Sequence, residues 1–358
     1  MKKLRIAVLY GGTSAEHEVS VVSARSVLAA IDRDKYDVLP IAITKSGEWL
    51  LPDRAPHELK AAEGSLPEVG DGQAVVLREG GELLASRART EAPIDAVFVL
   101  LHGPGGEDGT VQGLLETLGI PYVGAGVAAS ALGMDKSLQK PVFANAGIPV
   151  TPWITISAAE FDRDPQAAVR RARDAIGLPA FTKPASLGSS VGVSKCRTAE
   201  ELQRGIELAF SHDHAIVVEQ AIDGRELECA VLGNDEPEAS VVGEVVPAHE
   251  FYDYEAKYLI EGSKLIIPAP VPEAISEQIR RYAVQAFQAI GCSGMARVDF
   301  FVHGERGDEI LLNEINTIPG FTPISMYPKL WEATGIPYAK LIDRLIELAL
   351  ERHRVRPR

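Results

Sequence analysis

Short apolar runs and helical periodicities alternate along the first part of the chain. The run LRIAVLYGG ends in glycines, and the next segment places Val19, Val22, Ser26, Ala29 and Ala30 at helical spacing. A second apolar run, DVLPIAIT, follows after a helix-length interval. This order predicts a strand, a glycine-rich turn, a helix and a second, parallel strand, which together form a right-handed βαβ unit.

Further elements extend this pattern to about residue 126. Residues 60–90 look like a surface loop and a hairpin. The runs IDAVFVLLHG, TVQGLLETLG and PYVGAG then predict a strand, a helix and another strand. We therefore expect residues 1–126 to form an N-terminal α/β domain.

Residues 127–217 form a second block of alternating helix and strand patterns. MDKSLQKPVFANAG predicts a helix stopped by Gly147, and PVTPWITI predicts a strand. PQAAVRRARDAIG predicts a helix, and PAFTKPA and GVSKC predict two strands around a Ser/Gly loop. The helix TAEELQRGIELAFS begins with a threonine N-cap and an acidic first turn.

Residues 218–358 form a third block, which is rich in strands. AIVVEQAI, RELECAVLG and SVVGEVVP predict strands, and a polar aromatic loop separates them from the helix ISEQIRRYAVQAFQAIG. The strands GMARVDFFV and EILLNEIN follow, and a last helix is expected near residues 338–352.

Composition narrows the class of protein. With 358 residues, the chain is long for one domain, and 46% hydrophobic with 24% charged residues is ordinary for a globular protein. The formal net charge of −14 argues against a nucleic-acid partner. No apolar run is long enough for a membrane span or a signal-peptide core, so no membrane partner and a cytoplasmic location are expected. Cys196, Cys229 and Cys292 form no C-x-x-C pair and are interpreted as core residues.

The stretch LLNEINTIPGFT carries candidate metal ligands. Glu314 and Asn316 share one face of a strand, as Arg297 and Asp299 do in the preceding strand. If the two polar faces coincide, Asp299, Glu314 and Asn316 offer three oxygen donors, which suit a hard cation such as Mg²⁺. The alternative is a solvated outer face of the sheet, because the connecting loop does not determine the strand register.

A magnesium site with few protein ligands implies a phosphate-bearing partner. Lys183 lies at a strand end before a loop that contains Gly188, Ser189 and Gly192, whose backbone N–H groups suit an anion. Lys136 is a second candidate cation at a helix start. The alternatives are a plain turn and a surface lysine, and no Walker A sequence is present.

Seven motifs in order give the chain a resemblance to a known family. GGTSAEHEVS, LHGPGGEDGTVQGLLE, MDK, FTKPASLGSSVGVSK, FYDYEAKY, GMARVDFF and NEINTIPGFT resemble those of D-alanine:D-alanine ligases in the ATP-grasp superfamily. The resemblance covers essentially the whole chain. It implies an α/β three-domain ATP-grasp fold and ATP-dependent joining of two D-alanines through an acylphosphate, for peptidoglycan synthesis. It also suggests a homodimer built through the N-terminal domain.

The resemblance assigns the nucleotide and metal contacts. The resemblance implies that two Mg²⁺ (or Mn²⁺) ions would be held by Asp299, Glu314 and Asn316. It also implies the ligands of the nucleotide: Lys136 and Lys183 for the α- and β-phosphates, Lys257 for the γ-phosphate, Glu219 and the backbone of Ile222 for adenine, and Glu226 for the ribose.

The resemblance also assigns the substrate contacts. Glu16 would pair with the ammonium group of the first D-alanine, and Ser325 would take the carboxylate of the second, with His102 near its amine. Arg297 and the backbone N–H of Gly320 would face the tetrahedral oxyanion. An amine is favoured as the second substrate by the intact EAKY, and D-serine stays open.

A lid loop is expected at residues 249–265, on the polar aromatic stretch HEFYDYEAKYLIEG. The resemblance implies that Tyr258 of this loop bonds Ser189, which in turn meets Glu16. Closure of this lid would keep water away from the acylphosphate. A packed surface loop is the alternative.

Rival functions fit the sequence less well. A nicotinamide-binding oxidoreductase would need G-x-G-x-x-G, which GGTSAE lacks, and Asp32 precedes the second strand instead of ending it. A non-catalytic nucleotide-binding regulator would not need the full set of candidate ligands and cations. Another ATP-grasp ligase is the nearest enzymatic alternative and would differ chiefly at Glu16, Tyr258 and Ser325.

Overall fold

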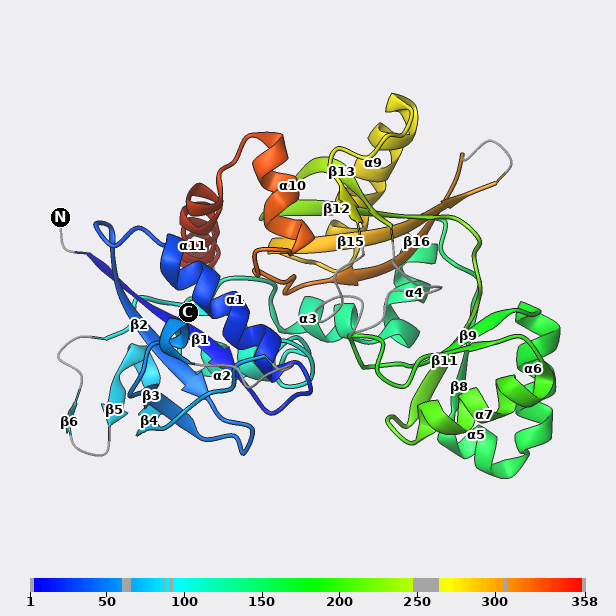
Figure 1. Ribbon diagram of the computed structural model, residues 1–358, viewed down its shortest axis with the longest axis horizontal. Helices are drawn as coiled ribbons and strands as arrows, with labels where there is room; N and C mark the ends of the chain where they lie inside the picture. Colours follow the sequence, from blue (N-terminus) through cyan, green and yellow to red (C-terminus); the bar gives the residue numbers. More distant parts are fainter. Residues whose placement is uncertain are drawn as a thin grey trace.

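Three β-sheets organise the structure, which is a computed structural model (Figure 1). It describes residues 3–59, 66–85, 88–89, 93–246, 264–304 and 308–355. The predicted lid loop 249–265 therefore lies outside the described residues, except for Lys264 and Leu265. Lys257 and Tyr258 lie outside them as well.

The N-terminal sheet has the strand order β6-β5-β4-β3-β2-β1-β7. Strand β1 pairs in parallel with β2 and β7, so the predicted parallel arrangement is confirmed, and β4 and β5 form the expected hairpin. The strands are β1 (Leu4–Gly11), β2 (Tyr36–Ile43), β3 (Trp49–Pro52), β4 (Gly72–Leu77), β5 (Leu83–Ala85), β6 (Ala88–Arg89) and β7 (Ala96–Val99). The helices are α1 (His17–Ala30), α2 (Thr110–Thr117) and the 3₁₀ helices η1 (Pro56–Glu58) and η2 (Glu79–Gly81).

The segment PYVGAG does not form the expected strand. Tyr122 makes only an isolated bridge to Val97, and Gly124 then turns with φ at 104°. A left-handed φ of this kind favours glycine and ends an extended run.

The central sheet is antiparallel, with the order β10-β9-β11-β8. Thr198 caps α7 as predicted, because its side chain accepts a hydrogen bond from the backbone N–H of Glu201. The elements are β8 (Trp153–Ser157), α5 (Ala158–Arg163), α6 (Pro165–Ile176), β9 (Ala180–Pro184), β10 (Ser194–Cys196), α7 (Ala199–Phe210) and β11 (Ala215–Gln220). Strand β11 spans the predicted domain boundary at residues 217 and 218, and the domain limits stay a prediction.

The C-terminal sheet is also antiparallel, with the order β14-β13-β12-β15-β16. Helix α9 packs against four of these strands, and α10 contacts β12 and β13. The elements are β12 (Arg225–Gly233), β13 (Glu238–Val246), β14 (Lys264–Ile266), α9 (Glu273–Ala289), β15 (Gly294–His303), β16 (Glu309–Asn316), α10 (Met326–Thr334) and α11 (Tyr338–Val355). Two helices, α3 (Val127–Met134) and α4 (Lys136–Asn145), contact β16.

One face of the C-terminal sheet changes character along its strands. Met295 and Leu232 pack in a hydrophobic core that also contains N-terminal residues such as Phe98. Two and four positions further along β15, the same face presents Arg297 and Asp299. The apolar half therefore joins the N-terminal sheet, and the polar half is left for a site.

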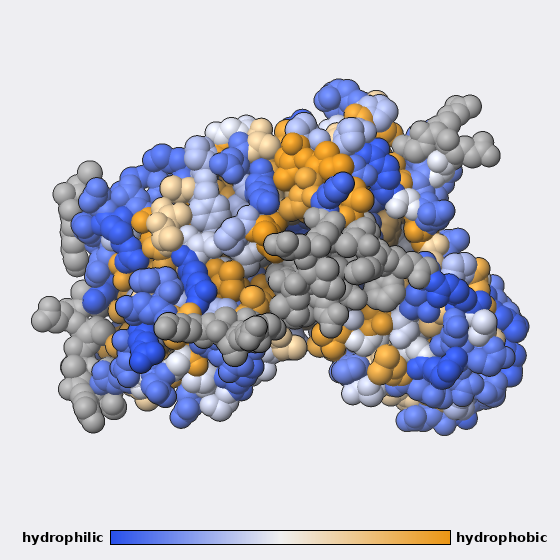
Figure 2. All heavy atoms as spheres, in the orientation of Figure 1, coloured by the Kyte–Doolittle hydropathy of each residue, from blue (hydrophilic) through white to orange (hydrophobic). Residues whose placement is uncertain are grey.

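Surface and core residues follow ordinary rules. Hydrophilic side chains predominate at both ends of the face shown in Figure 2, and hydrophobic ones gather near β13 and α10. Cys196, Cys229 and Cys292 are free and buried, as predicted. Among the residues that the structure describes, no helix is both long and apolar enough to cross a membrane.

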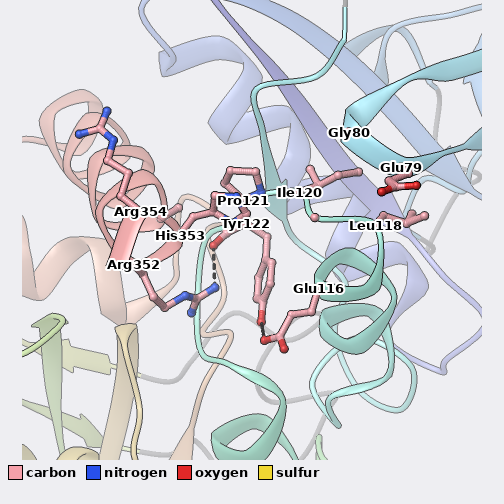
Figure 3. Close-up of a pocket in the computed structure, with 12 residues that line it drawn as sticks. Glu79, Gly80, Glu116, Leu118, Ile120, Pro121, Tyr122, Arg352, His353 and Arg354 are labelled. Atoms are coloured by element: carbon pink, nitrogen blue, oxygen red, sulfur yellow. Dashed lines mark hydrogen bonds between the residues drawn. The ribbon is translucent and has the colours of Figure 1, made fainter. Parts of the chain in front are cut away.

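The end of α11 is fastened to two other parts of the chain by Arg352. Its guanidinium donates to the carbonyl of Tyr122 at 3.1 Å (Figure 3). It also donates to the hydroxyl of Ser293 at 3.0 Å and lies 4.3 Å from the centre of the Tyr122 ring. Arg352 and Tyr122 line a cavity of about 930 Å³ beside α2. None of the described site residues predicted from the sequence lines it.

Replacing Arg352 should loosen this joint. We expect Arg352→Met to lower the free energy of unfolding by about 1–3 kcal/mol, because hydrogen bonds and a cation–π contact are lost. Urea denaturation measures the change. The control is Arg344→Met on the same helix, since Arg344 is 42% exposed and pairs with two exposed glutamates, Glu347 and Glu351; its loss of stability should stay below about 0.5 kcal/mol. Equal losses of unfolding free energy in the two variants would show that the contacts of Arg352 do not stabilise this joint.

Candidate active site

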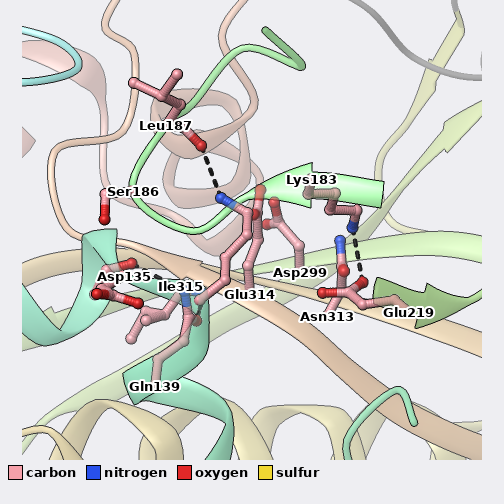
Figure 4. A network of polar contacts seen from close by, with 12 residues as sticks. Asp135, Gln139, Lys183, Ser186, Leu187, Glu219, Asp299, Asn313, Glu314 and Ile315 are labelled. Carbon is pink, nitrogen blue, oxygen red and sulfur yellow. Dashed lines mark hydrogen bonds and ion pairs between the residues drawn. The ribbon is translucent and has the colours of Figure 1, made fainter. Parts of the chain in front are cut away.

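The polar faces of β15 and β16 coincide. Asp299 lies directly opposite Glu314 (Figure 4). Arg297 lies opposite Asn316. The side chains of Asp299 and Glu314 are 14% and 30% exposed. These residues therefore converge as expected, and the alternative of a fully solvated face is wrong.

Arg297 is held between two carboxylates. It donates to both oxygens of Asp299, at 2.8 and 2.7 Å, and lies 3.0 Å from Glu228 Oε2 on β12. Burial by itself lowers the pKa of the Arg297 guanidinium, but the charges of Asp299 and Glu228 outweigh it and raise that pKa well above its usual value. Glu228 was not predicted as a site residue, although it follows Glu226 at strand spacing in RELEC.

The donor set fits a hard cation that is also bound by phosphates. Among the described residues there is no cluster of three or more His, Cys, Asp or Glu side chains suited to a metal. Magnesium usually takes only one or two protein carboxylates and completes its shell with phosphate and water. Asp299 and Glu314 supply two carboxylates, and the Asn316 amide oxygen accepts one backbone N–H, from Ile318, which leaves it a second lone pair.

Lys136 connects β16 to the Gly/Ser loop. It is the first residue of α4, where Asp135 forms the N-cap. Its Nζ donates to the carbonyl of Leu187 at 2.8 Å and lies 3.4 Å from Glu314 Oε2. Lys136 is only 8% exposed, so it is not an ordinary surface lysine.

Glu219 on β11 binds two lysines. Lys183 Nζ lies 2.8 Å from its Oε2 (Figure 4), and Lys140 Nζ lies 3.1 Å from its Oε1. Burial alone would raise the pKa of Glu219, but the two lysines outweigh it and lower that pKa. Burial also opposes the charge of Lys183, yet attraction to Glu219 leaves the pKa of Lys183 raised.

Lys140 was missed in the sequence. Its side chain is completely buried, and burial lowers its pKa in spite of Glu219. The available signal was its position four residues after Lys136, which places both lysines on one face of α4.

The Gly/Ser loop has a strained backbone. Ser189 and Ser190 have φ values of 49° and 59°, a left-handed conformation that residues other than glycine rarely adopt. The backbone N–H of Ser186 donates to Asp213 at 2.8 Å and anchors the start of the loop. Strain of this kind concentrates at ligand clamps and active sites, which argues against a plain turn.

Glu16 joins this loop to the N-terminal domain. The hydroxyl of Ser189 donates a hydrogen bond to Glu16 Oε1. A Cβ atom at Gly103 would lie 2.8 Å from Glu16 Oε2, and one at Gly188 would lie 3.2 Å from it. The carboxylate therefore fits between two glycines from different domains. The contact between Ser189 and Glu16 is the one that the family resemblance implied.

His102 is buried beside this carboxylate region. Its Nδ1 lies 3.2 Å from Glu107 Oε1, and its Nε2 lies 3.2 Å from Ser23 Oγ. Burial lowers the pKa of His102, but Glu107 outweighs it and raises that pKa. Both ring nitrogens thus contact protein groups, and a role near the substrate amine stays a prediction.

The turn after β16 is held by short polar contacts. Ser325 Oγ accepts from the backbone N–H of Thr322 at 3.0 Å and lies 2.8 Å from the Thr322 hydroxyl. The hydroxyl of Tyr338 donates to the carbonyl of Phe321 at 2.8 Å. A Cβ atom at Gly320 would lie 2.7 Å from Ser325 Oγ, so a side chain here would displace the Ser325 hydroxyl from its present contacts.

The remaining nucleotide candidates lie on β12 and in the segment that leads to it from β11. Glu226 is half-buried on β12, opposite Phe301 of β15. Ile222 is half-buried in the segment between β11 and β12. Their predicted contacts with the ribose and adenine stay predictions.

Known proteins resemble the chain over nearly its full length. Residues 5–125 match the family description "D-ala D-ala ligase N-terminus", and residues 142–347 match "D-ala D-ala ligase C-terminus". A D-alanine–D-alanine ligase of Ruminiclostridium cellulolyticum is 48% identical, with 99% of this chain and 97% of the relative covered. One from Geobacillus thermodenitrificans is 49% identical, with coverages of 98% and 96%.

Solved structures agree with these relatives. A D-alanine–D-alanine ligase of Coxiella burnetii is 41% identical and superimposes with a TM-score of 0.85, covering 99% of this chain and 96% of that one. The VanG D-Ala:D-Ser ligase of Enterococcus faecalis is 37% identical, with a TM-score of 0.83 and coverages of 97% and 100%.

The fold and these matches define an ATP-dependent ligase with the ATP-grasp architecture, and the predicted α/β fold class is confirmed. The chain belongs to the D-alanine–D-alanine ligase family.

A side chain at position 320 should disturb the turn. We expect Gly320→Ala to lower the free energy of unfolding by about 1–3 kcal/mol, because its Cβ overpacks Ser325. Chemical denaturation measures the change. Gly113→Ala in α2 is the control, since its Cβ would meet only Val127 at 3.9 Å; it should be neutral or stabilising by up to about 1 kcal/mol. A Gly320→Ala protein as stable as the unmodified chain would rule out the overpacking.

Proposed function

We propose that this protein joins two D-alanine molecules into D-alanyl-D-alanine and converts ATP to ADP and phosphate. The observation that carries the proposal is the hydrogen bond from Ser189 to Glu16. It connects the loop beside Lys136 and Lys183 with a carboxylate of the N-terminal domain. In this proposal, the region that binds phosphate and the site for the ammonium group are therefore neighbours.

The reaction has two steps in this proposal. A carboxylate oxygen of the first D-alanine attacks the γ-phosphorus of ATP, which gives an acylphosphate and ADP. The amine of the second D-alanine then attacks the acyl carbon, phosphate leaves, and the amine loses a proton. Both steps build negative charge on oxygen, so they need fixed cations and N–H donors and no covalent nucleophile on the protein.

In this proposal, lysines bind the phosphates of the nucleotide, and glutamates bind its base and its ribose. Lys136 and Lys183 bind the α- and β-phosphates, and Lys257 binds the γ-phosphate. Glu219 accepts from the exocyclic amine of adenine. The remaining contacts are those of the Ile222 backbone with the adenine edge and of Glu226 with the ribose.

Asp299, Glu314 and Asn316 would hold two Mg²⁺ (or Mn²⁺) ions. When bound, these ions neutralise charge on the phosphates and on the transferring group. Arg297 and the backbone N–H of Gly320 stabilise the tetrahedral oxyanion. The contacts of Arg297 with Asp299 and Glu228 already orient its guanidinium.

The two D-alanines occupy the region between the N-terminal domain and the turn after β16. Glu16 pairs with the ammonium group of the first, and Ser325 binds the carboxylate of the second. His102 lies near the amine of the second. The Tyr258 contact with Ser189 that the family resemblance implies lies outside the described residues; it would exclude water from the acylphosphate.

The cellular setting follows from this chemistry. The dipeptide is a precursor of peptidoglycan, and ATP is supplied in the cytoplasm. We propose a cytoplasmic homodimer that associates through the N-terminal domain.

Phosphate release from ATP tests the function directly. With Mg²⁺, release should require D-alanine, should not occur with L-alanine, and should accompany D-alanyl-D-alanine in mass spectra. D-Alanine with D-serine is the parallel reaction, because the chain also resembles a D-Ala:D-Ser ligase. Release only with another carboxylate and amine would reject the proposal and leave the fold assignment intact.

The carboxylate pair should be essential for turnover. We expect Asp299→Asn and Glu314→Gln each to lower kcat at least about 100-fold, since each removes a charge that stabilises the transferring phosphoryl group. Circular dichroism should show an unchanged fold. Glu309→Gln on β16 is the control, because the Glu309 side chain is 65% exposed, and this variant should keep full activity. Normal turnover in either site variant would refute the metal assignment.

A further inference from the structure

A completely buried lysine stands behind the proposed adenine contact. Lys140 extends from α4, and its side chain has no exposed surface. Its Nζ lies 3.1 Å from Glu219 Oε1 and 3.1 Å from the carbonyl oxygen of Asn313. A buried ammonium group is costly unless it is paired and hydrogen-bonded, so this position requires an explanation.

The two lysines on Glu219 differ in accessibility. The side chain of Lys183 is 14% exposed, whereas that of Lys140 is 0% exposed. Lys183 can therefore reach a ligand, and Lys140 reaches only protein groups. If Lys183 binds a phosphate, Lys140 still lies beside Glu219 as its partner.

Lys140 also determines where Glu219 sits. Its contact with Asn313 fixes the ammonium group to β16, at the bulge just before Glu314. Glu219 lies on β11, in the central sheet, and is 2% exposed. One side chain thus ties the carboxylate of one sheet to a strand of another.

We propose that Lys140 is a positioning residue that holds Glu219 as a charged acceptor, and that it thereby makes the site select a 6-aminopurine nucleotide over a 6-oxopurine nucleotide. This inference rests on the proposed contact between Glu219 and adenine. A carboxylate accepts a hydrogen bond from the 6-amino group and repels a 6-oxo group, which is itself an acceptor. A neutral or displaced Glu219 would not make this distinction.

Inosine triphosphate is the probe for this selection, because it replaces the 6-amino group of ATP by a 6-oxo group. The measured quantity is the ratio of kcat/KM for ATP to kcat/KM for inosine triphosphate, from D-alanine-dependent phosphate release. Lys140→Met should lower this ratio about tenfold or more, chiefly through the loss with ATP, because a charge-assisted hydrogen bond is weakened. Lys183→Met is the matched control: it should slow both nucleotides alike and keep the ratio, since their phosphates are identical.

A double variant separates the positioning role from general damage. Glu219→Gln alone should lower the ratio, and adding Lys140→Met to it should change the ratio no further, because Lys140 acts only through Glu219. The double variant removes the buried ammonium group and the carboxylate of this pair together, so neither is left without the other. It therefore covers the case in which Lys140→Met alone does not fold. Lys140→Gln, which keeps a donor without the charge, gives the same single-variant comparison.

The outcomes are distinct. A ratio that Lys140→Met or Lys140→Gln leaves unchanged, while Glu219→Gln lowers it, would overturn the role of Lys140 alone. A further drop in the double variant would overturn it as well. A ratio that Glu219→Gln leaves unchanged would reject the adenine contact and this inference with it. Absence of D-alanine-dependent release in the unmodified protein would instead reject the proposed function.

Discussion

The pairing of Asp299 with Glu314 across neighbouring strands is the constraint on which the site depends. Two carboxylates on one face of a half-buried sheet repel each other unless cations compensate them. Arg297 supplies one cation from the same strand, and Lys136 supplies the other from α4. The strand register thus dictates where the positive groups of other elements must lie.

The apolar half of the same face of the C-terminal sheet connects the site to the N-terminal sheet through hydrophobic packing. Phe321, in the turn after β16, packs edge-on against Phe98 of β7 with ring centres 5.6 Å apart. The backbone N–H of Phe321 also donates to Ser23, which contacts His102. One hydrophobic core contains residues of the N-terminal sheet together with Phe321 and its neighbours. This packing fixes the position of Glu16 relative to the turn at Gly320.

The central sheet is joined to the site differently. Its own hydrophobic core contains only residues between Ile156 and Val218. Polar groups make the connection: Lys140 bridges Glu219 and Asn313, and Lys136 binds Leu187. A phosphate can compete for the contact of Lys136, whereas it cannot replace apolar packing or reach the buried Lys140. A segment attached in this way suits the closure of a nucleotide site.

The sequence by itself determined the elements with strong periodicity, the family, and most of the candidate site residues, because local patterns and ordered motifs carry that information. Even the capped helix α7 and the parallel β1–β2 pair could be predicted. Only the tertiary structure decided the register of β15 and β16, the fork of Arg297 with Glu228, and the burial of Lys140. Each depends on partners far away in the chain, and a loop sequence or a helical spacing does not specify which distant group will lie within 3 or 4 Å.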